Sequence, residues 1–207
     1  MPETRIMFLA GEPSGDQLAA ELVSALRAAA SPRAVECFGA GGPKLAGAGV
    51  ELAFDLLQHA IIGIPSLPEY LRFRGFRNQL VALARERGPD IFIGVDFFGF
   101  NGSLARSLKE DLAAHERPRI VQFVSPQVWA SRPGRARRVA QTHDLLLSIL
   151  PFEKEWYARN APGVRVEFVG HPMVDRHPER SANRSTAIEV ARPRVLLLPG
   201  SRTGEIH

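Results

Sequence analysis

The chain has 207 residues, of which 45% are hydrophobic and 23% charged, so it is long enough for one substantial core and too short for two full-sized domains. This composition excludes a disordered or fibrous protein, because aromatics make up 8% and the 18 Gly and 16 Pro form no low-complexity tract. The net charge of +4 suits a partner with phosphate groups or an anionic lipid surface, but a general bias toward Arg produces the same value.

Cys37 is the single cysteine, which excludes an intrachain disulfide and a zinc site with several thiolates. The apolar run within the first ten residues is too short for an export signal. Nowhere do about 18 apolar residues follow one another, as a membrane-spanning helix requires. Any membrane contact is therefore expected to be peripheral.

Short apolar runs alternate with longer amphipathic ones, which is typical of βαβ units around a parallel sheet. The predicted strands are residues 6–10, 35–38, 90–95, 120–124, 145–149 and 164–168. The predicted helices are residues 15–29, 67–87, 101–115, 135–142 and 152–160. This order predicts an α/β domain with a Rossmann-like, doubly wound parallel sheet over residues 1–175.

The texture of the sequence changes after this domain. Residues 176–193 are rich in Arg, Glu, Ser and Pro without periodicity, and we expect a linker there. A new strand and a turn follow in residues 194–207, where they either add to the preceding sheet or begin a second domain. A strand and a turn cannot bury a core alone, so both interpretations stay open at this point.

The first predicted strand ends in the GEPSGD motif, residues 11–16, and a helix follows at once. Open α/β sheets bind ligands at the carboxyl ends of their strands, and the amino end of a helix attracts anions. The motif is neither a phosphate-binding loop nor a dinucleotide fingerprint. It is either a ligand loop or an ordinary helix cap formed by Ser14 or Asp16.

Asp96 directly follows the fully apolar run 91–95 and precedes several phenylalanines. A carboxylate at the carboxyl end of a strand, walled by aromatic rings, is a candidate general base. The alternative is that Asp96 caps the next helix or orients a loop.

Residues 125–132 read SPQVWASR, and three further arginines follow within residues 135–138. A Trp beside polar groups can form the wall of a binding site, and clustered guanidinium groups can hold phosphate. Such a cluster is equally typical of a solvated helix face. Nucleic acid is disfavoured, because no stacking platform accompanies the arginines.

Residues 61–77 mix bulky apolar side chains with Arg at close spacing. Two interpretations are open for this segment. It contacts lipid, as a membrane surface or as acyl chains, or its apolar side packs into the core. The six His residues show no metal-ligand spacing, so no metal site is predicted.

Several motifs together resemble the lipid A disaccharide synthase family. They are GEPSGD at 11–16, GAGGPKL at 39–45, IGI at 62–64, GVD with FN at 94–101, SPQVWA with Arg at 125–132, LPFEK at 150–154, VGHPMVD at 169–175, and LPGSR with Glu at 198–205. Each motif is modest alone, but their order and spacing run from end to end of the chain.

The resemblance implies the amino-terminal half of a GT-B glycosyltransferase, with a second domain only begun in this chain. Members transfer diacylglucosamine from UDP-diacylglucosamine to diacylglucosamine 1-phosphate, at the cytoplasmic face of the bacterial inner membrane, and need no cofactor or metal. In such an inverting transfer, one base deprotonates the acceptor hydroxyl and cationic or amide donors stabilise the UDP leaving group.

By the resemblance, Asp96 is the candidate catalytic base and Arg202, with Gly200 and Ser201, the candidate nucleotide site. The other expected substrate contacts are Glu12, Ser14, Asp16, Asn101, Gln127, Trp129, Arg132 and Arg135. Because most nucleotide contacts come from the carboxyl-terminal domain in GT-B enzymes, the 207-residue chain is expected to be inactive alone.

Three motifs depart from the family pattern. Ser66 replaces a carboxylate of G-I-V-E-V, next to a departure at Pro65, and Ser131 replaces the second Trp of W-A-W-R. In D-x-P-D-F-N, Asp96 is kept and Gly99 replaces the second acid. An alternative function is a non-catalytic lipid-binding or regulatory module derived from the family. A UDP-sugar epimerase is disfavoured by the SPQVWA and GHP motifs.

Overall fold

A computed structural model describes residues 4–59 and 66–176 of the chain. The chain divides into two compact units, residues 1–172 and 173–207. The second unit contributes only Met173–Arg176 to the described part, within the short helix α8 (Pro172–Arg176). The predicted linker, the second-domain start and residues 60–65 lie outside the described residues. The fold below is that of the first unit.

The core of the first unit is a seven-stranded sheet in which every pairing is parallel. Its strand order is β3-β2-β1-β4-β5-β6-β7. The strands are β1 (Thr4–Ala10), β2 (Val35–Gly41), β3 (Glu51–Asp55), β4 (Ile91–Val95), β5 (Arg119–Phe123), β6 (Leu145–Ser148) and β7 (Arg165–Phe168). This architecture confirms the predicted α/β, Rossmann-like fold and fits the amino-terminal half of a GT-B glycosyltransferase.

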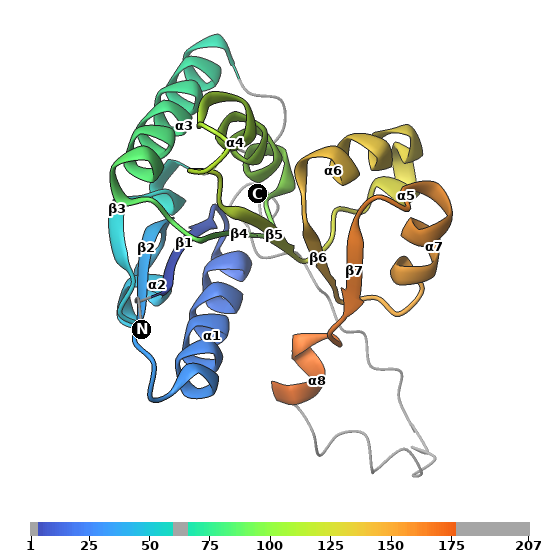
Figure 1. Ribbon diagram of the computed structural model, residues 1–207, viewed down its shortest axis with the longest axis horizontal. Helices are drawn as coiled ribbons and strands as arrows, with labels where there is room; N and C mark the ends of the chain where they lie inside the picture. Colours follow the sequence, from blue (N-terminus) through green and yellow to red (C-terminus); the bar gives the residue numbers. More distant parts are fainter. Residues whose placement is uncertain (1–3, 60–65, 177–207) are drawn as a thin grey trace, which may run out of the picture. The chain divides into compact units, whose positions relative to one another are not determined.

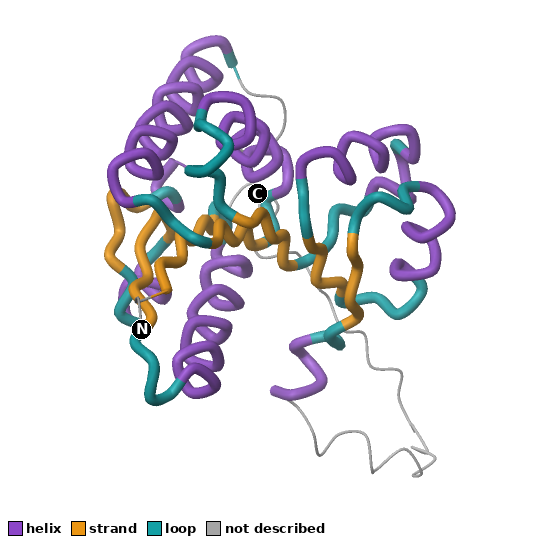
Figure 2. The backbone as a smooth tube through the Cα atoms, in the orientation of Figure 1, coloured by secondary structure: helices purple, strands orange, loops and turns teal. Residues whose placement is uncertain are grey.

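Helices cover both faces of the sheet (Figure 1). One face carries α1 (Pro13–Ala30) and α2 (Pro43–Gly47), and the other carries α3 (Leu67–Arg87), α4 (Phe98–Asp111) and α6 (Ala136–Thr142). The remaining helices of this unit are α5 (Val128–Ser131), α7 (Glu153–Asn160) and the 3-10 turns η1 (Leu57–His59) and η2 (Pro133–Arg135). Figure 2 shows the strands running between the two helical layers.

Alternate side chains of the central strands feed two separate cores. Met7, Leu9 and Phe92 pack under α3 and α4. Phe8 and Val95 pack on the other face, under α1 and α2. Strands buried on both faces must be apolar throughout, which is why the run of residues 91–95 could be recognised from the sequence.

Strand order reverses between β1 and β4. The chain moves outward from β1 through β2 to β3, then crosses back and continues on the other side through β4 to β7. A crevice forms at such a switch point, outside the carboxyl ends of the two strands, and ligands of open α/β sheets bind there. The residues that follow β1 and β4 are those of the GEPSGD motif and Asp96.

His143, at the end of α6, is buried in its uncharged form. Its side chain is 2% exposed, its ring lies 5.6 Å from that of Phe98, and its Nδ1 is 2.8 Å from the Thr142 hydroxyl. Burial, with a smaller contribution from the nearby Lys109 charge, lowers the pKa of His143 from 6.5 to about 4. The folded protein therefore takes up this proton at a lower pH than the unfolded chain does.

We predict that stability falls as the pH drops from 6.5 to about 4, since only the unfolded state is protonated in that window. The loss over the whole window is about 3 kcal/mol. His143→Phe should flatten this part of the profile, whereas His115→Gln at an exposed position should leave it unchanged. Urea unfolding at several pH values measures the effect, and an equally steep profile in His143→Phe contradicts it.

Candidate active site

Asp96 lies where β4 ends, at the switch point. Its backbone amide donates to the Phe123 carbonyl at 2.9 Å, which continues the pairing with β5. Asp96 then turns to φ 50° and Phe97 to φ 38°, a left-handed conformation that residues other than glycine rarely adopt. Strained backbone of this kind persists where the surrounding structure holds it, and it is concentrated at functional sites.

Two buried amide side chains hold this turn. Asn101 Nδ2 donates to the Asp96 carbonyl at 2.7 Å, and Gln122 Nε2 donates to the same oxygen at 2.8 Å. Gln122 also donates to the carbonyls of Phe123 and Val124. The other amide atoms, Asn101 Oδ1 and Gln122 Oε1, are buried without a partner in the described structure. These two residues therefore stabilise the strained turn at a cost in unsatisfied oxygens.

The Asp96 carboxylate takes no part in this scaffold. It is half-buried, and no described residue donates a hydrogen bond to it or forms an ion pair with it. The alternative that Asp96 caps the next helix is wrong, because α4 has Phe97 at its N-cap and no side-chain cap bond. By contrast, Asp90 at the other end of β4 accepts the Arg5 amide at 2.8 Å. Asp96 thus has a fixed backbone and an unengaged acid group.

The GEPSGD turn packs directly against Asp96. A Cβ placed on Gly15 would lie 3.1 Å from the Val95 carbonyl and 3.5 Å from the Asp96 Cβ, so α1 approaches β4 closely there. A Cβ on Gly11 would collide with the Phe97 ring. Glu12 is half-buried at the start of α1 and Ser14 is exposed beside it. The structure thus brings Glu12, Ser14 and Asp96 to the same edge of the sheet.

Asp16 is buried on α1 and faces the start of α2. It is 1% exposed, and both carboxylate oxygens accept backbone amides, from Gly42 at 2.8 Å, Lys44 at 3.0 Å and Leu45 at 3.2 Å. The three donors are the free amides at the start of α2. Asp16 therefore joins the GEPSGD motif to the GAGGPKL motif, and its substrate contact stays a prediction.

Asn101 is fully buried, and its amide donates to the Asp96 carbonyl. Its contact with substrate stays a prediction. Asn101 acts on the site by positioning the turn that carries Asp96.

The SPQVWA segment follows β5 and lies next to Asp96. Side chains of α7 hold it in place by hydrogen bonds. Glu153 is buried, and its two oxygens accept the Ser125 hydroxyl at 2.6 Å, the Ser148 hydroxyl at 2.6 Å and the Trp129 indole at 2.9 Å. Tyr157, whose pKa is raised by burial, donates to the Pro126 carbonyl at 2.8 Å. Trp129 remains half-buried and Gln127 exposed. The LPFEK motif thus shapes the loop that carries both residues.

Arg132 and Arg135 follow this loop and are both exposed. Arg135 lines a cavity between α4 and α6, together with residues of both helices. Gly200, Ser201 and Arg202 lie outside the described residues, so the structure places only the β1, β4 and β5 part of the expected site. Within that part, no group of three His, Cys, Asp or Glu side chains gathers as a metal site would require.

Two residues of this site were missed in the sequence. Gln122 is the one polar side chain in the apolar run 120–124, and that contrast was a usable signal. Glu153 gave no such signal, because an acid at the first position of a helix is ordinary on a surface.

A family model for lipid-A-disaccharide synthetase matches residues 6–207. The chain belongs to the lipid-A-disaccharide synthetase family. It is similar to the lipid-A-disaccharide synthases of Alkalilimnicola ehrlichii, at 41% identity over 210 residues, and of Myxococcus xanthus, at 43% over 210 residues. Each alignment covers 98% of this chain, and 53% and 52% of those two relatives. The chain therefore spans about half the length of the relatives it matches.

Asp16→Asn tests the hydrogen bonds by which the Asp16 carboxylate joins the GEPSGD motif to the GAGGPKL motif. The amide would place an N–H group against a backbone donor of α2, so we expect the free energy of unfolding to fall by about 1–3 kcal/mol. Ser14→Ala, in the same motif but exposed, is the matched control and should change stability by less than about 0.5 kcal/mol. Thermal or urea unfolding measures both variants. Equal stability of Asp16→Asn and Ser14→Ala would refute the assigned role.

Proposed function

We propose that this chain is the acceptor-side half of an enzyme that transfers 2,3-diacylglucosamine from its UDP derivative to 2,3-diacylglucosamine 1-phosphate. The products are lipid A disaccharide 1-phosphate and UDP. The observation that carries the proposal is the Asp96 carboxylate, which no described residue engages. Its backbone lies in a strained turn at the switch point, where the Asp96 carbonyl accepts two hydrogen bonds. The similar proteins are named lipid-A-disaccharide synthases, which supports the proposed product.

In this proposal Asp96 is the general base. It removes the proton from the acceptor hydroxyl as that oxygen attacks the anomeric carbon of the UDP-sugar, and the carbon is inverted. A carboxylate that accepts no hydrogen bond from the described residues is available to the substrate hydroxyl. Asn101 and Gln122 hold the backbone that carries this carboxylate, so the base is positioned before the substrate binds.

The leaving group needs compensation for the charge that develops on its phosphate. We assign this role to Arg202 with Gly200 and Ser201, by their match to the family motif. Glu12, Ser14, Gln127, Trp129, Arg132 and Arg135 are proposed to contact the substrates from the amino-terminal half. Since the nucleotide side belongs to the second half of the fold, the 207-residue chain alone should bind UDP-sugar weakly and not turn over.

Asp96→Asn is the direct test, in a protein that carries this chain together with the second half found in the relatives. We expect kcat to fall by about 10²–10⁴-fold, since the amide cannot accept the proton. Binding of UDP-sugar should change little. Asp90→Asn is the matched control at the opposite end of β4, because its remaining oxygen still accepts the Arg5 amide. Near-normal turnover of Asp96→Asn would remove it as the base.

The start of α3 supports a peripheral membrane contact. Leu67, Tyr70 and Leu71 are 71%, 56% and 53% exposed on its first two turns, and Arg72 and Arg74 are exposed beside them. Phe73 and Phe76 pack into the core, so only part of the predicted 61–77 segment is available to lipid. No helix in residues 4–59 and 66–176 is long and apolar enough to cross a bilayer. We propose that these residues place the site at the inner face of the inner membrane.

Leu67→Ser combined with Leu71→Ser should reduce flotation of the chain with phosphatidylglycerol vesicles about tenfold, because two exposed leucines no longer enter the interface. Stability should stay unchanged. Val174→Ser, 66% exposed on α8, is the control for loss of an exposed apolar side chain. Equal flotation of all three proteins would contradict the assignment.

The alternative function, a non-catalytic lipid-binding or regulatory module, is favoured by the same exposed α3 surface. It predicts that membrane binding depends on Leu67 and Leu71 while Asp96→Asn has no effect on any activity. The two variants together separate the enzyme from the module.

A further inference from the structure

A cavity of about 250 Å³ opens between α4 and α6. Two facing helical stripes form its walls. Gly99, Gly102, Ser103 and Arg106 share one face of α4, since they are three and four residues apart. Arg135 of η2, with Arg138, Val139 and Thr142 of α6, repeats this spacing on the other side.

Small residues are the reason that the two helices leave a gap. A Cβ placed on Gly99 would meet no atom within 4 Å, and a Cβ on Gly102 would meet the Phe98 ring at 3.2 Å. Phe98 is held in turn by the His143 ring behind it, 5.6 Å away. The cavity therefore has an aromatic wall at Phe98 and an open space at Gly99.

The charge around this space is positive and uncompensated. Arg106, Arg135 and Arg138 line the cavity, and none of them pairs with a carboxylate in the part of the chain that the structure describes. Among the residues that the structure describes, no carboxylate lines the cavity. The acid nearest in sequence to α6, Asp144, is engaged by Lys109 at 3.6 Å and by the Ile120 amide.

The Ser103 hydroxyl adds a donor to the lining, whereas the Thr142 hydroxyl already donates to the Arg138 carbonyl at 3.0 Å. The Ser103 hydroxyl accepts Arg77 Nη1 at 3.4 Å, so its own proton remains available to a ligand. The Arg77 guanidinium, which does not line the cavity, is therefore a fourth positive group next to its Ser103 side. Guanidinium groups from two helices with a hydroxyl between them are the donor set that proteins use for phosphate, and the volume suits a small ligand group rather than a whole lipid.

We propose that this cavity binds a phosphate monoester through Arg106, Arg135 and Arg138. The proposed acceptor carries such a group, and to that extent the inference rests on the proposed function. Soluble sugar phosphates and the headgroup of phosphatidic acid share the same chemistry. Gly99 brings no carboxylate to this place, so the arginines of the lining are left for an external anion.

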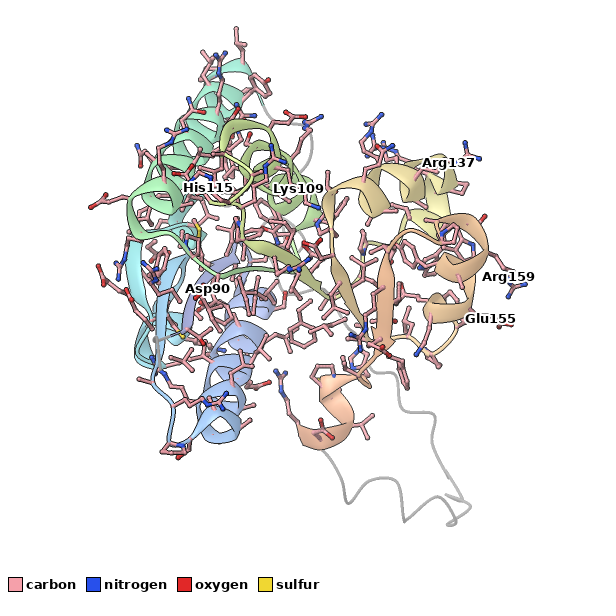
Figure 3. All side chains as sticks on the ribbon, in the orientation of Figure 1. Asp90, Lys109, His115, Arg137, Glu155 and Arg159 are labelled. Carbon is pink, nitrogen blue, oxygen red and sulfur yellow. The ribbon has the colours of Figure 1, made fainter. Side chains whose placement is uncertain are left out.

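The first test measures binding of glucosamine 1-phosphate and of inorganic phosphate to the 207-residue chain by calorimetry, without any transfer reaction. Arg106→Gln and Arg138→Gln should each weaken binding about tenfold, because each removes charged hydrogen bonds. Gly99→Asp should abolish it, since the new carboxylate pairs with the arginines. Arg137→Gln is the matched control on the same helix, because Arg137 is exposed and does not line the cavity (Figure 3).

The second test uses phosphatidylcholine vesicles with and without phosphatidic acid. If the ligand is a lipid headgroup, Arg138→Gln lowers flotation with phosphatidic acid and inorganic phosphate competes with it. If the ligand is soluble, only the calorimetric affinity depends on the cavity residues. The proposal is overturned if the chain binds neither probe, or if Arg137→Gln weakens binding as much as Arg138→Gln does. Since no transfer is measured, this result stands apart from the Asp96→Asn test.

Discussion

The pair of hydrogen bonds that Asn101 and Gln122 donate to the Asp96 carbonyl determines the geometry of the whole site. They act together with the bond from the Asp96 amide to the Phe123 carbonyl to hold two consecutive residues in a left-handed conformation at the end of a buried strand. The backbone oxygen is bound, and the side-chain acid is consequently left for a substrate. Two buried amide oxygens without partners are the energetic cost of this arrangement.

The family motifs work as interlocking pairs. Asp16 of GEPSGD binds the backbone of GAGGPKL, and Glu153 of LPFEK binds Ser125 and Trp129 of SPQVWA. In each pair a buried carboxylate from one segment organises a loop from another. Motifs that look catalytic in the sequence therefore include residues whose role is to shape the loops around Asp96.

Much of the fold could be predicted because central parallel strands are apolar on both faces. The run 91–95 needed only its unbroken apolar character, and the predicted helix 67–87 has the same bounds as α3. The edge strand β3 was missed, because its alternating, half-exposed residues give a weak signal. Helix α4 begins at Phe98 rather than Asn101, since the phenylalanines before Asn101 resemble a strand. The place of Asp96 followed from the strand before it, whereas the partners of Asp16 and Asn101 depend on contacts between distant segments.

The strand order also bears on how the protein forms during synthesis. β2 pairs with β1, β3 with β2, and β4 with the free side of β1, and each later strand adds to the one before it. Each strand after β1 therefore pairs with a strand that has already left the ribosome. The sheet can grow outward from β1 in the order of translation. The turn bearing the proposed base is complete once Gln122 has emerged, well before the last strand of the sheet.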